Sequence, residues 1–194
     1  MAHAPARSGM KTLRKRDFPV GEMRRYLEPG PVVLVSSRHG DETGIMTMGW
    51  HTCMEFTPSL IGCIISNANH SFTLIRDSGA CVINVPSADL IDTVVGIGNT
   101  SGAEIDKFRH FGLTPDEARK VKVPLIRECF ANFECRLHDD ALVEEYNFFV
   151  FEVVKAHVAA SRKQPRTLHY KGDGAFMLSG ETVSRRSKFR PGML

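Results

Sequence analysis

Short apolar segments, each closed by turn-forming residues, follow one another closely through the first half of the chain. Residues 31–37 (PVVLVSS) are followed by His39-Gly40-Asp41, and residues 79–85 (GACVINV) are stopped by Pro86. Residues 60–66 (LIGCIIS) are apolar on both faces, which is typical of a central strand. Apolar runs of this length with turn residues between them predict a succession of β-strands.

The rest of the chain adds further strands and a few short helices. The additional elements are strands at 43–53, 131–137 and 146–159 and helices at 71–77, 87–95 and 106–111. In the second of these helices, Ser87 is the expected N-cap and Gly96 the expected end. Many closely spaced strands with few helices predict a mainly β fold, a β-barrel with helical insertions.

Length, composition and charge limit the class of protein, its domain organisation and its partners. The 194 residues are 42% hydrophobic and 24% charged, which is the balance of an ordinary globular domain. The net charge of +3 is too small to indicate a nucleic-acid partner. We expect one domain over residues 18–183, between a flexible basic arm at 1–17 and a second basic arm at 184–194. No apolar stretch approaches the roughly twenty residues that cross a bilayer, so no membrane partner is expected.

Cysteine usage indicates a reducing compartment. The chain has five cysteines, an odd number, and no pair has CxxC spacing. Cys53, Cys63 and Cys81 lie inside apolar runs, so we expect buried free thiols rather than disulfides. The N-terminus also has no hydrophobic signal core. These features predict a cytoplasmic protein.

The glycine-containing loop at residues 96–102 (GIGNTSG) invites comparison with a dinucleotide-binding fingerprint. Its spacing is GxGxxxG and a helix pattern precedes it, so it does not fit that fingerprint, which follows a strand. Two interpretations stay open: a helix end followed by a flexible loop, or a phosphate- or ribityl-facing loop. In the second, Asn99, Thr100 and Ser101 offer neutral hydrogen-bonding groups.

Residues 66–71 (SNANHS) lie between an apolar strand and a helix start, where backbone N–H groups and the positive helix end face outward. Ser66, Asn67 and Ser71 could add donors to a phosphate, or Asn69 or Ser71 could simply cap the helix. Arg76 and Lys107 are candidate cations for a phosphate dianion, and each could instead be an ordinary surface charge.

The strand expected at 43–53 carries Met46, Met48 and the only tryptophan, Trp50. A flat heteroaromatic cofactor needs polarizable side chains against its ring and backbone groups for its heteroatoms, although core packing would use the same residues. The eight histidines form neither an HExxH motif nor a His/Cys cluster, and no GxSxG motif is present. We predict no metal site and no catalytic side chain.

Seven segments, taken in order, resemble the flavin reductase-like, FMN-binding split-barrel family, and within it the flavoredoxin-type proteins. They are residues 28–37 (EPGPVVLVSS), 45–52 (IMTMGWHT), 58–72 (PSLIGCIISNANHSF), 81–86 (CVINVP), 98–108 (GNTSGAEIDKF), 145–156 (EYNFFVFEVVKA) and 174–181 (GAFMLSGE). The resemblance covers roughly residues 28–183. It implies a split β-barrel with Greek-key-like topology, and a homodimer that binds FMN in a cleft near the subunit interface.

The resemblance also implies a set of cofactor-binding residues. These are Thr47, Met48, Gly49 and Trp50 along the isoalloxazine, Ser66, Asn67, His70 and Ser71 at the phosphate and ribityl chain, and Asn99, Thr100, Ser101 and Lys107 closing over the phosphate end. Relatives often have Ser or Ala where this chain has Gly49, so only a backbone contact is expected there. Lys107 is the cation expected to balance the charge of the phosphate.

The function that this resemblance implies is electron or hydride transfer from NAD(P)H, or from a protein donor, to flavin or another acceptor. The isoalloxazine carries the redox chemistry, so the protein needs no acid or nucleophile of its own. A backbone N–H or Thr47 is the expected donor to the reduced ring. Two alternatives stay open: a non-enzymatic FMN-binding electron-transfer protein, and a split-barrel protein that uses another cofactor such as pyridoxal phosphate.

Overall fold

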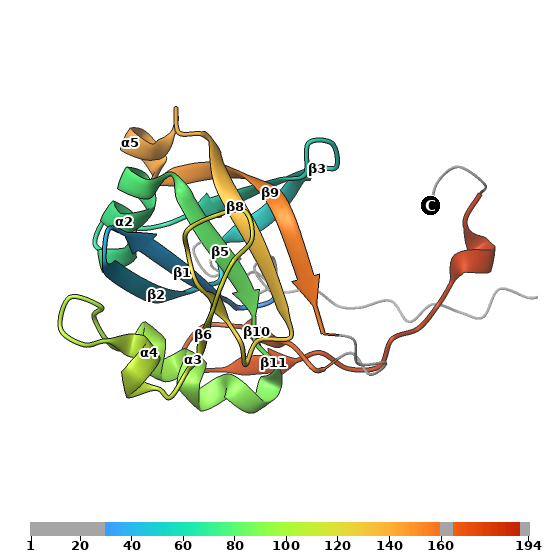
Figure 1. Cartoon of the computed structure of the whole chain (residues 1–194). Helices are drawn as coiled ribbons and strands as arrows, with labels where there is room; N and C mark the ends of the chain where they lie inside the picture. The colour runs from blue at the N-terminus through green and yellow to red at the C-terminus, as the bar shows by residue number, and fades with distance from the viewer. Residues whose placement is uncertain (1–29, 160–164, 191–194) are drawn as a thin grey trace, which may run out of the picture.

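The computed structural model describes residues 30–159 and 165–190 (Figure 1). Its main element is a seven-stranded antiparallel sheet with the strand order β2-β1-β5-β8-β9-β4-β3. The strands are β1 (Val33–His39), β2 (Glu42–Met48), β3 (His51–Glu55), β4 (Leu60–Ile64), β5 (Ala80–Val85), β8 (Ala131–Asp139) and β9 (Phe148–Val158). The prediction of a mainly β fold is confirmed. The predicted arm at 1–17 lies outside the described residues, as do the last four residues of the arm at 184–194.

The sheet rolls around one hydrophobic core and carries a second core on its other face. Along β1, Val33 and Val35 point into the first core, whereas Leu34 points into the second. This is the two-residue alternation of a strand with both faces buried. Met46 of β2 and Cys63 of β4, which lie near opposite ends of the strand order, share the first core. The sheet is therefore a barrel whose two edge strands, β2 and β3, leave it open.

Two helices cover opposite sides of the β1–β2 hairpin (Figure 1). α2 (His70–Ser78) places Phe72 and Ile75 in the first core, and α3 (Ile91–Gly98) places Val94 and Ile97 in the second. The remaining short elements are η2 (Ala88–Leu90), α4 (Lys107–His110), β6 (Pro115–Asp116), β7 (Leu125–Ile126), α5 (Val143–Tyr146), β10 (Leu168–Tyr170), β11 (Phe176–Leu178) and η3 (Arg186–Lys188). Among the described residues, no helix has the length and apolar character needed to cross a membrane.

Two of the predicted elements differ from the structure. The single strand predicted at 43–53 is wrong: β2 ends at Met48 and β3 begins at His51, and the two strands lie at opposite edges of the sheet. The helix predicted at 87–95 is a 3-10 turn followed by α3, and Gly96 does not end it. A Cβ at Gly96 would lie 2.5 Å from Cε1 of Phe111, so this glycine lets the ring of Phe111, which follows α4, pack closely against α3.

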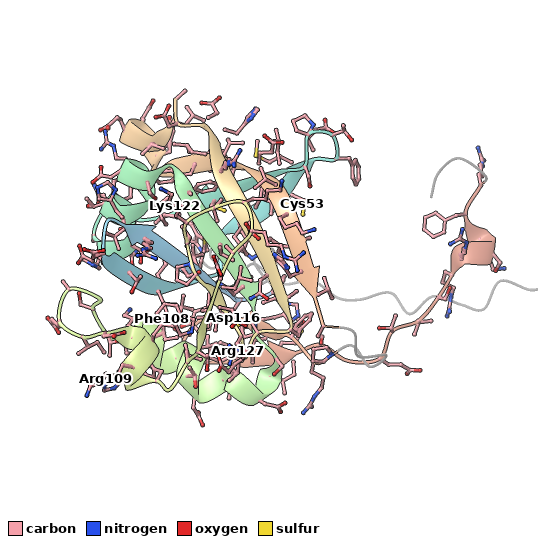
Figure 2. All side chains as sticks on the ribbon, in the orientation of Figure 1. Cys53, Phe108, Arg109, Asp116, Lys122 and Arg127 are labelled. Carbon is pink, nitrogen blue, oxygen red and sulfur yellow. The ribbon has the colours of Figure 1, made fainter. Side chains whose placement is uncertain are left out.

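A long connection from β6 to β7 crosses the outer face of β5 and β8 (Figure 1). Glu134 of β8 holds it in place, because its carboxylate accepts the backbone N–H groups of Arg119, Lys120 and Val121. The same carboxylate lies 2.7 Å from Nε2 of His157, and Glu134 is fully buried. At the base of the connection, the guanidinium of Arg127 binds the carboxylate of Asp116 (Figure 2) and lowers the pKa of that carboxyl.

All five cysteines are free, and four of them are buried. The prediction of a buried thiol is wrong for Cys53, which lies exposed on the edge strand β3 (Figure 2). Burial raises the pKa of the Cys129 thiol to about 12, and burial also raises the pKa of Cys63. A hydrogen bond with Cys135 raises the pKa of Cys81. Thiols with raised pKa values and no access to solvent are poor nucleophiles.

We expect a thiol reagent such as Ellman's reagent to modify one cysteine per native chain rapidly, and the other four only after unfolding. The fast phase reports Cys53, because the other four thiols are buried away from the reagent. The Cys53→Ser variant should lose the fast phase and keep the four slow ones. Any fast thiol in that variant would contradict the packing described above.

Candidate ligand-binding site at the open edge of the sheet

β2 forms one edge of the sheet, and three helix ends lie around it. The strand pairs only with β1, so every second residue presents its N–H and C=O away from the sheet. The start of α2, the end of α3 and the start of α4 all lie against this hairpin (Figure 1). An edge strand with free backbone groups is a suitable surface for the polar rim of a flat ligand.

The start of α2 is an uncapped helix end. Asn69 occupies the N-cap position, but its side chain makes no capping hydrogen bond, so the interpretation that Asn69 caps the helix is wrong. The N–H of Asn69 donates to the Ser66 carbonyl at 2.9 Å, and the N–H of Ala68 donates to Ser66 Oγ at 3.3 Å. Ser66 and Asn67 are exposed beside this end. The first N–H groups of a helix have no acceptor within it, so they are available to an anion.

His70 connects this helix start to the loop that follows α3. Its Nε2 is fully buried and lies 2.9 Å from a carboxylate oxygen of Glu42, yet it makes no hydrogen bond of normal geometry. A Cβ at Gly102 would lie 2.9 Å from His70 Cδ2, so the loop passes directly over the imidazole. Ser71 is buried with its Oγ towards Gly44 of β2. The structure thus brings the two predicted phosphate-facing loops together at His70.

The loop after α3 caps that helix and leads to a buried cation. Thr100 Oγ1 donates to the Gly96 carbonyl at 3.0 Å, and Ser101 Oγ accepts the N–H of Ala103 at 3.2 Å. Asn99, the C-cap residue that follows α3, is exposed. The hydroxyls of Thr100 and Ser101 therefore have local partners in this structure.

Lys107 is the buried cation, with only 7% of its surface exposed. Its Nζ donates to the Ile97 carbonyl at 2.8 Å, and within the described residues no carboxylate pairs with it. Burial lowers the pKa of Lys107 because the charged form loses its hydration. A buried charge without a counter-ion is costly, and an anion bound beside it would remove much of that cost.

The four residues predicted along the isoalloxazine take different positions. Thr47 is half-buried, its hydroxyl donates to the Val94 carbonyl at 2.8 Å, and it lies beside Gly98. Met48 is buried in the first core, as the core-packing interpretation predicted. Gly49 and Trp50 form the link between β2 and β3, and Trp50 is 52% exposed. Their contacts to a cofactor stay predictions.

One residue predicted from the sequence lies away from this site, and two residues of the site were not predicted. Arg76 lies in the last turn of α2 and pairs with Glu144, so it is at the far end of the helix from the loops around His70. Two residues of the site carried no predicted role: Glu42, which faces His70, and Gly102, which makes room for it. Gly102 is the last residue of the loop at 96–102 that the sequence analysis singled out, but only the fold shows that His70 lies against it. Among the described residues, no group of three or more potential ligands could hold a metal ion.

These observations fit an anionic ligand with a flat polar body. A buried cation with no carboxylate partner among the described residues, an uncapped helix start and a buried imidazole nitrogen without a hydrogen bond all belong to the elements around β2, whose outer edge is open. Fold and site together define an open β-barrel protein that binds a phosphate-bearing ring compound. The phosphate and isoalloxazine of FMN match these two parts.

The chain belongs to the flavin reductase like domain family, whose sequence pattern matches residues 23–177. An uncharacterized protein of Archaeoglobus fulgidus is 33% identical over 153 residues, covering 78% of this chain and 86% of that protein.

Solved structures agree with this assignment. The FMN-binding domain of a flavin reductase-like enzyme from Shewanella baltica is 26% identical, with a TM-score of 0.72 over 86% of this chain and 95% of that one. Flavoredoxin of Desulfovibrio vulgaris has the same fold, with 23% identity and a TM-score of 0.75 over 92% of this chain and 97% of that one. The architecture is therefore the split barrel of FMN-binding proteins, as the sequence predicted.

Proposed function

We propose that the chain binds FMN along β2 and passes electrons from NAD(P)H, or from a protein donor, to flavin or another acceptor. The observation that carries this proposal is the buried ammonium group of Lys107, which has no carboxylate partner among the described residues. A phosphate group is the anion that membership of the flavin reductase like family favours at this position.

The chain's own residues bind and orient the cofactor. Lys107, the first N–H groups of α2 and the loop at Gly102 would hold the phosphate, and the outward backbone groups of β2 would face the ring. The hydroxyl of Thr47 already donates to the Val94 carbonyl, so the donor to the reduced ring is a backbone N–H. When bound, FMN supplies the redox chemistry, and no acid or nucleophile from the protein is required.

A titration of the purified protein with FMN, followed by flavin fluorescence, tests binding. We expect saturable quenching by FMN, weaker binding of riboflavin and no competition by pyridoxal phosphate at equal concentration. Steady oxidation of NADH or NADPH by a catalytic amount of protein with excess FMN identifies a reductase. Reduction that stops at one equivalent of bound flavin identifies the electron carrier instead. A protein that binds no FMN contradicts both.

The homodimer belongs to the same proposal. An apolar surface suitable for a second copy lies on β3, β4 and the turn between them, where Met54, Phe56 and Ile64 are exposed. Phe56 is 94% exposed, and an exposed patch of large apolar side chains is typical of a protein–protein interface. The cytoplasmic location stays a prediction that rests on the cysteine usage.

Replacement of Gly102 by alanine should weaken FMN binding by about tenfold, the loss that follows from displacing one group at the phosphate end. The added Cβ would lie 2.9 Å from Cδ2 of His70, so the imidazole or the loop must move. Gly180→Ala is the matched control, because nothing lies within 4 Å of its Cβ position. Fluorescence titration of both variants measures the effect, and equal affinities would show that this loop does not contact the cofactor.

A further inference from the structure

A cavity of about 1320 Å³ lies on the outer face of the sheet. It is enclosed by the β1–β2 turn, the end of α2, the start of β5, the second half of β8 and the β6–β7 connection (Figure 1). None of the described residues that line it was predicted to bind FMN. His70 begins α2 at the candidate FMN site, whereas Ser78 ends that helix at this cavity. We call it the outer cavity.

The floor of the outer cavity holds two arginines on either side of a small residue. Ser36 of β1 pairs with Val82 of β5. Two residues nearer the β1–β2 turn, and therefore on the same face, Arg38 is level with Ala80, which in turn pairs with Arg136 of β8. Neighbouring strands are about 4.8 Å apart, so the Cα atoms of the two arginines are about 10 Å apart. Two guanidinium groups can thus approach one small ligand from two sides.

The β6–β7 connection adds two lysines to the lining, Lys120 and Lys122 (Figure 2). The connection is fixed on both sides of Lys122. Nη2 of Arg136 donates to the Lys120 carbonyl at 2.9 Å, and Oγ of Ser36 donates to the Pro124 carbonyl at 2.6 Å. The cavity is therefore formed before a ligand arrives, which lowers the entropy lost on binding.

The four cations of the lining keep their charge available to a ligand. Within the described residues, none of them forms an ion pair with a carboxylate. Nε of Arg38 donates to the Gly40 carbonyl at 3.0 Å, which leaves its remaining N–H groups for other acceptors. Glu152 of β9 pairs with Arg136 in the register, but it forms no ion pair with that arginine and does not line the cavity.

Carboxylates also line the outer cavity, and they come from its surrounding loops and helix end. They are Asp41 in the β1–β2 turn, Asp77 in the last turn of α2, and Asp116 and Glu117 at the start of the connection. Asp116 is bound by Arg127. The other three carboxylates form no ion pair within the described chain and can accept hydrogen bonds from hydroxyl groups. No phenylalanine, tyrosine or tryptophan is among the described lining residues, so the cavity offers no stacking surface to a flavin or a nucleoside base.

We infer that the outer cavity binds a compact compound with two phosphoryl groups, one held by Arg38 and the other by Arg136. A guanidinium group binds a phosphate through two parallel hydrogen bonds, and Lys120 and Lys122 balance the remaining charge. Inorganic pyrophosphate and a bisphosphorylated sugar share this chemistry. The carboxylates of the lining favour the sugar, because its hydroxyl groups can donate to them. The inference does not depend on FMN binding.

Isothermal titration calorimetry with fructose 1,6-bisphosphate at low ionic strength tests the inference. We expect saturable binding of one equivalent per chain. Arg38→Gln and Arg136→Gln should each weaken it by at least about tenfold, because each removes a bidentate charged contact. Lys122→Gln should weaken it by about threefold, since an exposed point charge contributes less. Pyrophosphate should bind more weakly than the sugar bisphosphate, and the reverse order would assign the cavity to the inorganic compound.

Matched controls separate this cavity from general attraction to a basic surface. Arg190→Gln and Lys171→Gln replace exposed cations outside the lining and should leave the affinity unchanged. Arg136 also holds the connection, so Lys122→Gln, which removes none of the hydrogen bonds that fix the connection, gives an independent measure. Saturating FMN should not displace the bisphosphate.

Three results would overturn the inference. The first is that neither fructose 1,6-bisphosphate nor pyrophosphate binds. The second is an equal loss of affinity in Arg38→Gln and in Arg190→Gln, which would show attraction to net charge alone. The third is competition by FMN, which would place the phosphoryl groups at Lys107. A protein that binds the bisphosphate but no FMN contradicts the proposed function and leaves this inference standing.

Discussion

Replacement of Lys107 by methionine should weaken FMN binding by about 100-fold while the protein without cofactor becomes no less stable. A charge-assisted contact between a buried ammonium and a phosphate is worth about 2–3 kcal/mol, which corresponds to that loss of affinity. Before the phosphate binds, the same ammonium lowers the stability of the folded protein, because it is buried with one backbone carbonyl as its partner. Methionine fills a similar volume and removes a charge that costs free energy to bury.

The opposite signs of the two effects make this variant informative. Fluorescence titration measures the affinity, and urea denaturation without cofactor measures the free energy of unfolding. Riboflavin lacks the phosphate, so its affinity should be the same for Lys107→Met and for the wild type. Lys171→Met, at an exposed lysine between β10 and β11, should change neither quantity. Equal losses of FMN and riboflavin affinity would place Lys107 away from the phosphate.

The strands of this protein were predictable because their sequence pattern is local. Apolar runs closed by turn residues identified β1, β4 and β5, and both faces of β1 are buried, as its continuous apolar run implies. The break between β2 and β3 was not predictable in the same way. Residues on both sides of Gly49 favour extended backbone, and only pairing with β1 on one side and β4 on the other separates them.

The candidate site was predictable in its parts but not in its contacts. The loops at 66–71 and 96–102 were singled out by their residue types, and the fold brings them together at His70. Nothing in the sequence indicates that Glu42 faces His70, since the two meet only through the packing of α2 on the β1–β2 hairpin. Lys107 was predicted as a cation for a phosphate, but its burial without a carboxylate partner is a property of the fold.

Replacement of Glu134 by alanine should lower the free energy of unfolding by about 4 kcal/mol, within the range measured for breaking buried charged networks. The carboxylate accepts three backbone N–H groups from the β6–β7 connection and faces His157, so its loss leaves these donors without a partner. Glu128→Gln is the matched control, because Glu128 is exposed and accepts the single N–H of Thr114. Its effect should stay within about 0.5 kcal/mol. Urea denaturation at neutral pH measures both.

Acid should reproduce this loss in the wild type. Burial raises the pKa of Glu134, but hydrogen bonds from His157 and the three N–H groups outweigh it, so the folded-state pKa lies below the ordinary value of 4.5. A group with a depressed folded pKa stabilises the fold above its unfolded pKa, and this contribution disappears as the pH falls through the folded pKa. The difference in unfolding free energy between wild type and Glu134→Gln should therefore shrink as the pH falls below 4.5. A difference that stays constant down to the acid-unfolding limit would show that the carboxylate holds the connection by packing rather than by its charge.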